Sequence, residues 1–337
     1  MPMAHRATLE DVARLAGVSA KTVSRVFNRR DLVNPATADI VLAAAARLRF
    51  RPAALARGLR HGRSGTVGLI VGELGNPFYY KVAAGIEHEL AAHGYGLILA
   101  TTDDTVEGER RVAQALLAQR VSALMLIPVS EDQAYLDGER QLGTPVIAVD
   151  RPARNLVADS VVLDNRAGAL DATRRLIERG HRRIGYVCNP ASVWSQTERV
   201  AGYREAMAEA GMADTARWER IVNDRDARAE DLVRELLTAP APPTALICGN
   251  NRIGVGALRT LKALRDETTA LICFDDFDTA DVLDVSVVTY DPRDLGRRAA
   301  EVALARIQDP TGFTRQLVLP TWVIERGTGE RSPRGEQ

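Results

Sequence analysis

Residues 8–28 read TLEDVARLAGVSAKTVSRVFN, and this stretch carries the signals of two short helices joined by a tight turn. Thr8 can cap the first helix, with Asp11 at its third position, and Gly17 can end it. Ser19 can cap a second helix, in which valines recur at helical spacing. Two helices joined by a glycine-containing turn of this length are typical of a helix-turn-helix.

A third helix is predicted after Asn34, which can serve as its N-cap with Pro35 at the first helical position. Three helices make a minimal core, so the sequence predicts a small all-α domain at the N-terminus. The residues expected to form the buried stripe of the third helix are Ile40, Val41, Ala44 and Leu48.

The charge of the chain is distributed unevenly, although Lys plus Arg and Asp plus Glu number 44 each. Residues 1–62 contain ten arginines and one lysine against four acidic residues, a net charge of +7 that leaves −7 for the remainder. A basic head on an acidic body indicates that the head meets a polyanion, because basic side chains gain affinity by releasing counterions from phosphates. Charge alone is explained equally well by a solvated basic face.

The second helix of a helix-turn-helix enters the major groove of DNA by its N-terminal end. A generic amphipathic helix would explain the valines, but not the order of cap, turn and cap beside a basic outer face. The pattern therefore favours DNA binding. The residues placed to contact base edges are Ala20, Lys21 and Arg25, and those suited to phosphate oxygens are Thr8, Ser19, Thr22 and Asn28.

Residues 51–65 read RPAALARGLRHGRSG, a short segment between the head and the rest of the chain. Pro52 can start a helix, but only about two turns follow before Gly58, and such a helix should be unstable alone in water. Its leucines and arginines could become ordered in the minor groove of bent DNA. A frayed tether without contacts is the alternative, and the residues alone do not decide between the two.

From Thr66 onward, short apolar runs that read as strands alternate with stretches of helical periodicity. The series divides into two halves near residues 150–165, with returns of the chain near 290 and 320. Such alternation predicts parallel sheets covered by helices on both faces. We therefore expect two doubly wound α/β subdomains, with a ligand bound beyond the carboxyl ends of their strands.

The residues at those strand ends are suited to a ligand with several hydroxyl groups. Carboxylates, an arginine, amides and aromatic rings supply acceptors, donors and a stacking face. Each also has an ordinary structural alternative, because an Asp or Asn after a strand commonly caps the next helix. The candidates are Asn76, Phe78, Asp150, Arg151, Trp194, Ser195, Arg199, Asn250 and Asp275.

From residue 8 to about 326 the sequence resembles the lactose-repressor (LacI) family of bacterial transcription regulators. The resemblance rests on the opening stretch, on RPAALARGLR, and on TVGLIVGELGNPFYYKVAAGIE, VIAVDR, VVLDN, IERGHRRIGYV, RVAGYREAM, PTALICGNN, IGVGAL and LICFDD. These segments keep the order and spacing of the family, which is more specific than any single helix-turn-helix. The resemblance implies an all-α helix-turn-helix DNA-binding domain and a periplasmic-binding-protein-like α/β body of two doubly wound subdomains.

The resemblance and the pattern of elements together predict the domain boundaries. The expected domains are a DNA-binding domain over 1–51, a hinge helix and linker over 52–65, an effector-binding and dimerisation domain over 66–326, and a disordered tail over 327–337. The N-subdomain is expected over about 66–163 and 291–318, and the C-subdomain over about 164–290 and 319–326. The tail is expected to be disordered because it is polar and lacks heptads.

The resemblance also implies roles for single residues. In the hinge helix, Leu59 would be the wedge inserted into the minor groove, with Ala56 and Arg60 beside it. Family operators are pseudo-palindromes read by a homodimer, and helices 78–94 and 106–119 would form the dimer interface. The residues implied to contact the effector are Asp150, Arg199, Asn250 and Asp275, with Phe78 and Tyr79 lining the pocket.

Three departures from the family pattern leave the ligand open. Asn251 replaces the acidic residue usual at its position, and Val193 and Trp194 stand where several members carry polar or basic groups. Tyr290 and Asp291 replace a commoner apolar or amide-bearing pair. We expect a repressor controlled by a sugar or polyol, with a purine-like effector as the runner-up; a sugar-binding protein without a regulatory role would have no use for the basic head.

An enzyme is a further class to weigh. The sequence has no G-x-S-x-G, no Walker-type loop and no metal-spaced cluster of His or Cys, so we expect no catalytic residue, no metal and no cofactor. His88 and His93 are expected to face solvent, and His181 to be the partner of a helix C-terminus.

The remaining features concern the compartment. The cysteines are odd in number, far apart, and each closes an apolar run, which predicts reduced, packed thiols. No apolar run approaches eighteen residues, and the N-terminus has no secretory signal, so we expect no membrane association and a cytoplasmic protein. The three cysteines are Cys188, Cys248 and Cys273.

Overall fold

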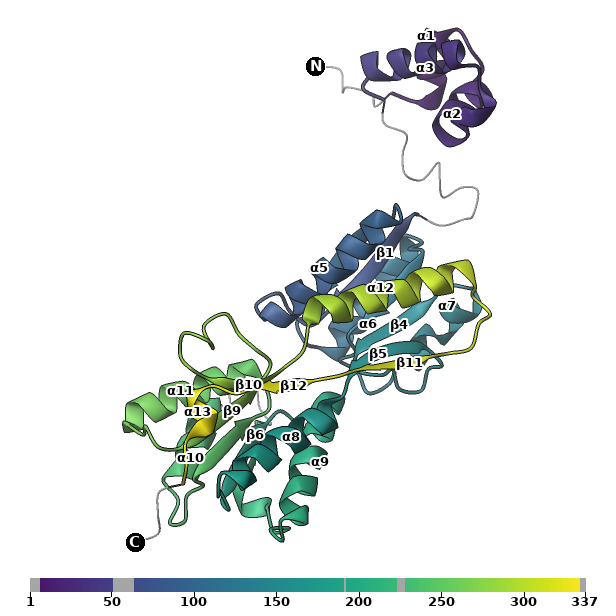
Figure 1. The fold of residues 1–337 in the computed structure, drawn as a ribbon. Helices are drawn as coiled ribbons and strands as arrows, with labels where there is room; N and C mark the ends of the chain where they lie inside the picture. The colour runs from purple at the N-terminus through teal and green to yellow at the C-terminus, as the bar shows by residue number, and fades with distance from the viewer. Residues whose placement is uncertain (1–6, 51–63, 191, 223–227, 334–337) are drawn as a thin grey trace. The chain divides into compact units, whose positions relative to one another are not determined.

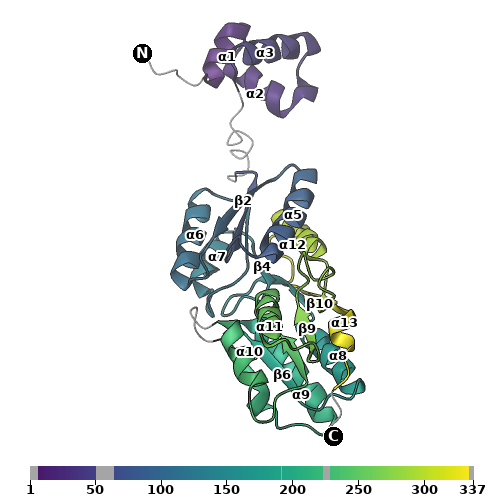
Figure 2. The same cartoon turned by 90° about the vertical axis from the view of Figure 1, so that its left-hand side faces the viewer.

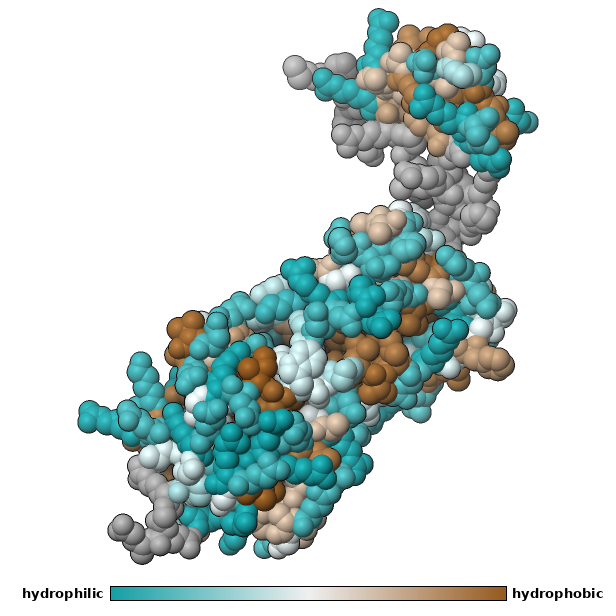
Figure 3. Space-filling view, viewed as in Figure 1, coloured by the Kyte–Doolittle hydropathy of each residue, from teal (hydrophilic) through white to brown (hydrophobic). Residues whose placement is uncertain are grey.

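The computed structural model describes residues 7–50, 64–190, 192–222 and 228–333. The chain divides into two units, a small helical head (residues 7–50) and a larger α/β body (Figure 1). The body holds two subdomains, each with its own six-stranded sheet. Polar side chains dominate the face seen in Figure 3, and no helix within the described residues is long and apolar enough to cross a membrane.

The head is built from three helices, and polar caps fix where they begin. Thr8 forms a capping box: its hydroxyl accepts from the N–H of Asp11 at 3.2 Å, and the Asp11 carboxylate accepts from the N–H of Thr8 at 2.9 Å. Gly17 ends this helix with a φ of 67°, and Ser19 caps the next by accepting from the N–H of Thr22. The helices are α1 (Leu9–Ala16), α2 (Ala20–Asn28) and α3 (Pro35–Arg47), with a 3-10 turn η1 (Arg30–Leu32) before α3.

The apolar faces of these helices form one small core. Val12 and Val41 are fully buried in it, and the rings of Phe27 and Phe50 lie 5.9 Å apart beside it. The prediction that Ile40 is buried is wrong, because its side chain is 55% exposed. Ile40 lies one residue, or about 100°, away from the centre of the stripe that faces the core. The buried residues of α3 are Ala38, Val41, Ala44 and Ala45.

The N-subdomain is a sheet between two layers of helices. In order across the sheet its strands are β11 (Gln316–Leu319), β5 (Asp159–Leu163), β4 (Val146–Asp150), β3 (Ala123–Leu126), β1 (Thr66–Val71) and β2 (Gly96–Thr101). Adjacent strands from β11 to β1 pair in parallel. One face is covered by α5 (Pro77–Ala92) and α12 (Pro292–Gln308), and the other by α6 (Val106–Ala118) and α7 (Asp137–Gln141) (Figure 2).

The C-subdomain repeats this plan. Its strands, in order, are β12 (Trp322–Ile324), β10 (Ser286–Thr289), β9 (Ala270–Phe274), β8 (Ala245–Cys248), β6 (Ile184–Cys188) and β7 (Glu219–Ile221). One core lies under α8 (Asn165–Glu178) and α9 (Trp194–Glu209), and a second lies under α10 (Ala229–Leu237) and α11 (Asn251–Leu264). The predicted fold class of two doubly wound subdomains is confirmed. The cysteines are buried free thiols, as predicted: Cys188, Cys248 and Cys273.

The chain passes between the subdomains three times, always at the carboxyl end of a strand. β5 leads into α8, β10 leads into α12, and β11 leads into β12. Only Pro320 and Thr321 separate the last two strands, so β12 enters the second sheet beside the carboxyl end of β10 and runs antiparallel to it, with Trp322 opposite Thr289. The carboxyl ends of both sheets therefore meet where the three crossovers lie.

The prediction of a disordered tail over 327–337 is wrong for residues 327–333. Residues Gly327–Glu330 form α13, which packs on β9 and β10. Thr328 is buried there, its hydroxyl donating to the carbonyl of Leu271 at 2.8 Å and accepting from the N–H of Ser286 at 2.9 Å. A polar segment without an apolar repeat is ordered here because its hydroxyl groups pair with backbone groups of the sheet.

His181 is fully buried and fastens the C-terminal segment. Its Nδ1 lies 2.8 Å from Oγ1 of Thr244, and its Nε2 lies 2.8 Å from the carbonyl oxygen of Arg331. Arg331 is the C-cap residue of α13, so His181 is the partner of a helix C-terminus, as predicted, although this helix is α13 and not α8, which precedes His181 in the chain. His88 and His93 are exposed, as predicted.

Candidate functional site

The outer face of α2 carries the candidate DNA contacts of the head. Lys21 and Arg25 are exposed, while Val23 and Val26 on the opposite side are buried. Ala20 stands at the start of the helix beside Lys21. The first turn contains Lys21 and no acidic residue, so a basic side chain adds to the positive end of the helix dipole, while Arg25 lies in the last turn. This face is suited to a polyanion.

The residues predicted to contact phosphate have additional roles in the caps. Thr8 donates its hydroxyl proton to the Asp11 carboxylate at 2.8 Å, so it is committed to the capping box. The hydroxyl oxygens of Ser19 and Thr22 lie 2.9 Å apart, so one donates to the other and one proton of the pair remains for a phosphate. The side chain of Asn28 lies outside the described residues, as do the predicted minor-groove residues Ala56, Leu59 and Arg60.

In the body, side chains from both subdomains meet at the carboxyl ends of the strands, a place we call the junction. The ring of Tyr290, at the crossover into α12, lies edge-on to Phe78 with centroids 6.0 Å apart. Nδ2 of Asn251 donates to Oδ1 of Asn76 at 3.2 Å. Candidate residues far apart in the sequence are therefore brought together. The junction comprises Asn76, Phe78, Tyr79, Asp150, Arg199, Asn251, Asp275 and Tyr290.

Arg199 is the centre of the hydrogen bonds on the C-subdomain side. Its Nε donates to Oδ1 of Asn165 at 2.7 Å, and its Nη1 donates to the carbonyl oxygen of Gly249 at 2.6 Å. Its Nη2 pairs with Oδ1 of Asp275 at 3.3 Å, and its guanidinium lies 4.1 Å above the ring of Phe274. The side chain is almost fully buried, and each of its three nitrogens contacts an oxygen of the protein.

Asp275 also accepts from the hydroxyl of Tyr290 at 3.0 Å. Burial, together with the nearby Asp275 carboxylate, holds the pKa of Tyr290 well above its usual value. Tyr290 therefore stays protonated and keeps donating to this carboxylate. The hydrogen bond links the end of β9 to the crossover that leads back to the N-subdomain.

Asp150 and Asp275 occupy equivalent places in the two subdomains. Each ends or follows a central strand, and each has a left-handed backbone, with φ values of 65° and 66°. Aspartate adopts this conformation more readily than most residues, and here it turns the chain in the same way at the ends of two equivalent strands. Burial raises the pKa of Asp150, an effect that the neighbouring Arg151, 3.4 Å away, opposes.

The start of α5 forms the other wall of the junction. Asn76 caps this helix by accepting from the N–H of Phe78 at 3.1 Å. Tyr79 is buried, and burial raises its pKa to about 12. Both aromatic rings are thereby placed by the cap, with Phe78 only partly covered.

Two ion pairs cross between the subdomains beside the Asn76–Asn251 hydrogen bond. Nζ of Lys81 lies 3.0 Å from Oδ1 of Asp278, and Arg252 pairs with Glu73. All of the N-subdomain partners come from residues 73–81. We call these three contacts the latch: Glu73–Arg252, Asn76–Asn251 and Lys81–Asp278.

The other predicted residues are less directly placed. Asn250 uses its side-chain oxygen to cap α11, accepting from the N–H of Ile253 at 2.9 Å, which is the structural alternative that the sequence left open. Trp194 is half-buried and Ser195 is buried at the start of α9. Four residues of the site were not predicted from the sequence: Asn165, Gln196, Asn251 and Tyr290. Of these, Asn251 and Tyr290 carried a signal, because both depart from the family pattern.

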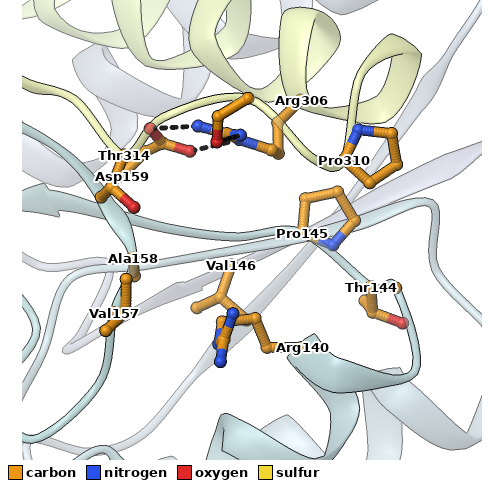
Figure 4. A pocket seen from close by; sticks show the side chains of 12 residues that line it. Arg140, Thr144, Pro145, Val146, Val157, Ala158, Asp159, Arg306, Pro310 and Thr314 are labelled. Atoms are coloured by element: carbon orange, nitrogen blue, oxygen red, sulfur yellow. Dashed lines mark hydrogen bonds and ion pairs between the residues drawn. The ribbon is translucent and has the colours of Figure 1, made fainter.

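A cavity of about 80 Å³ lies at the opposite edge of the N-subdomain, where β4, β5 and β11 begin. Figure 4 shows Arg306 beside the Asp159 carboxylate on one side of this cavity, with Nε and Nη2 donating to it at 2.7 and 2.9 Å. None of the predicted site residues lines this cavity. Its paired charges make it part of the packing of α12 rather than a candidate effector site.

Two family models match the chain. Residues 8–53 match the model of bacterial regulatory proteins, lacI family, and residues 64–321 match the model of periplasmic binding proteins and sugar binding domain of the LacI family.

Known proteins resemble the chain over nearly its whole length. It is 33% identical to the ribose operon repressor of Haemophilus influenzae, over 94% of this chain and 97% of that protein. A structure of the transcriptional regulator CelR with cellobiose is 31% identical, with a TM-score of 0.71 over 96% of this chain and all of that one. The lac repressor dimer bound to operator and an anti-inducer is 25% identical, with a TM-score of 0.85 over 96% and 99% of the two chains.

Proposed function

The chain belongs to the lacI family of bacterial regulatory proteins, and from this membership we propose that it is a transcriptional repressor whose affinity for operator DNA is controlled by a small ligand. One observation carries the proposal. A capped helix-turn-helix with exposed Lys21 and Arg25 and a two-subdomain body with a polar, aromatic junction occur in a single chain. The relatives named above are regulators and not enzymes. Such a protein acts on DNA in the cytoplasm.

The operator is a pseudo-palindrome read by two heads. The segment that contains Ala56, Leu59 and Arg60 lies outside the described residues, and we propose that it acts as the hinge on operator DNA, with Leu59 as the minor-groove wedge. Dimerisation through α5 and α6 is supported by exposed apolar side chains on these helices and on the adjacent edge strand β2, since such side chains favour a protein interface. The exposed residues are Tyr80, Leu99 and Val106.

The effector is a sugar or polyol bound at the junction. Two carboxylates, two amide side chains and the partly covered ring of Phe78 match the donors, acceptors and apolar face of a sugar. Trp194, Ser195 and Asn250 lie close in sequence to junction residues and complete the predicted contact set. By binding one arrangement of the subdomains more tightly, the effector changes operator affinity through a coupling free energy of roughly 1 to 3 kcal/mol.

DNA binding is tested by selecting the preferred site from a random duplex library and measuring affinity by fluorescence anisotropy. Arg25→Ala should lose roughly tenfold or more in affinity for the selected site, because a good base contact is worth about 1 to 3 kcal/mol. Arg47→Ala, which removes the same charge from the exposed side of α3, is the control. If Arg25→Ala and Arg47→Ala lose the same affinity for DNA, on the selected site and on random duplex alike, then α2 does not recognise bases.

The effector is tested by a thermal-shift screen of full-length protein against sugars, polyols and purines, followed by calorimetry on each compound that stabilises it. A neutral sugar or polyol should raise the melting temperature and change operator affinity. Asp275→Ala should abolish both effects while operator binding without ligand persists. If a purine is the only compound that stabilises the protein, the effector is the purine-like runner-up and not a sugar or polyol.

A further inference from the structure

Two side chains on the C-subdomain side of the junction each present a buried acceptor without a partner. Gln196 and Asn251 are 3% and 4% exposed. Oε1 of Gln196 and Oδ1 of Asn251 have no hydrogen-bond partner within the described residues. Both lie around Gly249, because Nε2 of Gln196 donates to its carbonyl at 3.0 Å and Asn251 follows two residues later.

The orientation of both amides is fixed by their neighbours. The nitrogen of Gln196 faces a backbone carbonyl, which can only accept. The nitrogen of Asn251 faces Oδ1 of Asn76, and this atom must be an oxygen because it accepts from the N–H of Phe78. The unpartnered atoms are therefore the carbonyl oxygens, and each needs a hydrogen-bond donor.

The oxygens that accept from these two amide nitrogens each have a second donor, so they would stay hydrogen-bonded without the amides. The carbonyl of Gly249 also accepts from Nη1 of Arg199 at 2.6 Å, and Oδ1 of Asn76 also accepts from the N–H of Phe78. An unpaired buried oxygen costs free energy, so each amide is a cost to the folded protein unless something donates to it. Buried groups of this kind call for an explanation, and a ligand is one.

Gln133 shows how a buried glutamine is satisfied when its role is structural. It is fully buried in the N-subdomain. Its Nε2 donates to Oε1 of Glu109 at 3.3 Å and to the carbonyl of Ser130 at 2.7 Å, and its Oε1 accepts from the N–H of Arg154 at 2.8 Å. Both ends of this amide are paired, in contrast to Gln196.

The cations around the junction are already engaged. Arg199 uses all three of its nitrogens within the protein, Lys81 pairs with Asp278, and Arg252 pairs with Glu73. Nη1 of Arg151 donates to the carbonyl of Pro128 at 2.9 Å, and its Nε has no hydrogen-bond partner within the described residues but lies 3.4 Å from Oδ2 of Asp150, which balances its charge. An anionic ligand would have to compete with the carboxylates that already pair with these cations, whereas the carboxylates and free amide oxygens accept hydrogen bonds from hydroxyl groups.

We propose that Gln196 and Asn251 determine the specificity of the effector site: their carbonyl oxygens accept hydrogen bonds from hydroxyl groups of a neutral, donor-rich ligand, and a phosphorylated sugar is rejected. This inference rests on the proposed function, because it places the effector at the junction. Gly249 allows the arrangement, since a Cβ at that position would come within 2.4 Å of Oε1 of Gln196.

The first experiment needs no ligand. Gln196→Met and Asn251→Leu replace each amide with an apolar side chain of similar volume and leave no acceptor unpaired. Their melting temperatures in full-length protein should equal or exceed that of the wild type, whereas Gln133→Met, which leaves the N–H of Arg154 unpaired, should lower it. If Gln196→Met and Asn251→Leu are as destabilising as Gln133→Met, the amides are structural and the proposal is overturned.

The second experiment uses calorimetry with D-ribose, D-glucose and cellobiose, the 5-phosphate of ribose and the 6-phosphate of glucose, and single-deoxy analogues of the sugar that binds best. Gln196→Met and Asn251→Leu should each weaken that sugar about tenfold, the size of one hydrogen bond. Each variant should also bind one deoxy analogue as tightly as the wild type binds it. The phosphate should bind at least tenfold more weakly than the free sugar.

The possible failures differ. If the wild type binds a neutral sugar and both variants bind it equally well, or if the phosphate binds more tightly, the specificity assignment is overturned while the proposed function stands. If none of these sugars binds and a purine does, the proposed sugar effector is wrong. The proposal that Gln196 and Asn251 accept hydrogen bonds from ligand hydroxyl groups is then wrong as well.

Discussion

Arg199 illustrates a residue whose neighbours decide its importance. It is a buried cation with three hydrogen-bonded nitrogens and the ring of Phe274 beneath it. Lysine keeps the charge but cannot reproduce the planar fork, so Arg199→Lys leaves acceptors of the junction unpaired. We expect a loss of about 3 kcal/mol in the free energy of unfolding, the size found when a buried ion pair is broken, as measured by urea denaturation.

Arg204 provides the matched control. It is 58% exposed and pairs with Glu219, with Nε to Oε1 at 2.9 Å. Arg204→Lys should cost at most about 1 kcal/mol, because the Arg204 guanidinium is in contact with solvent and the Glu219 carboxylate keeps the hydrogen bond from the hydroxyl of Thr215. Equal losses in the free energy of unfolding for Arg199→Lys and Arg204→Lys would show that the buried environment of Arg199 does not raise the cost of the substitution.

His181 should make stability depend on pH. Burial lowers the pKa of His181 below its ordinary value of 6.5, and the nearby Arg179 acts in the same direction. The unfolded chain therefore binds the proton more readily, so this contribution is complete above about pH 6.5 and is lost as the pH falls toward the folded pKa. Between pH 7.0 and 5.5 the free energy of unfolding should fall, by at most about 1.4 kcal/mol per pH unit.

The measurement is urea denaturation at several pH values in this window. His181→Gln should flatten the dependence, and His93→Gln, at an exposed position, should leave it unchanged. A wild-type stability that rises as the pH falls over this range would contradict the assignment.

At the scale of elements, helix α12 packs so closely on α5 that two glycines are required. A Cβ on Gly296 would lie 2.1 Å from the carbonyl oxygen of Val82, and a Cβ on Gly85 would lie 2.1 Å from that of Arg293. Both obstacles are backbone atoms, so Gly296→Ala must separate the helices. We expect a loss of roughly 1 to 3 kcal/mol by urea denaturation. Gly138→Ala, in α7 with no atom within 4 Å of the added Cβ, should be neutral or slightly stabilising.

The elements were largely predictable because they depend on local signals. The caps at Thr8 and Ser19 and the alternation of strands and helices in the body are short-range patterns. The antiparallel β12 and the ordered α13 were not predictable, since each depends on a neighbour far away in sequence. β12 is antiparallel because of where β11 ends, and α13 is ordered because Thr328 reaches the backbone of β9.

The junction shows the same division. Arg199 and Asp275 were predicted from family motifs and strand ends, and they do pair. Gln196 was missed because a buried glutamine inside a helix has no sequence signal that separates it from a solvated one. Asn250 was predicted to contact the effector, yet its side-chain oxygen caps α11. The sequence could not separate these two roles, because an Asn after a strand is suited both to binding a ligand and to capping the next helix.

At the scale of the whole molecule, the latch holds the two subdomains of the body together. The free energy of its contacts is similar in size to the coupling free energy of a typical allosteric protein. Exposed ion pairs contribute up to about 1 kcal/mol each. The Lys81–Asp278 and Glu73–Arg252 pairs are partly exposed, with Asp278 at 66% and Arg252 at 58%. Their sum is comparable with the roughly 1 to 3 kcal/mol of a typical allosteric coupling. Weakening the latch should therefore shift the balance between subdomain arrangements without unfolding the protein.

Charge reversal tests this role of the latch. Glu73→Arg places two cations together and should open the subdomains, while Glu73→Arg combined with Arg252→Glu restores an ion pair of opposite polarity. Hydrogen–deuterium exchange should become faster over residues 73–81 and at the start of α11 in the single variant and return toward wild type in the double variant. Added salt should reduce the difference, because it screens exposed charges. Equal exchange in all three proteins at low salt would mean that the hydrogen bonds of Asn76, Asp275 and Tyr290 hold the subdomains without these charges.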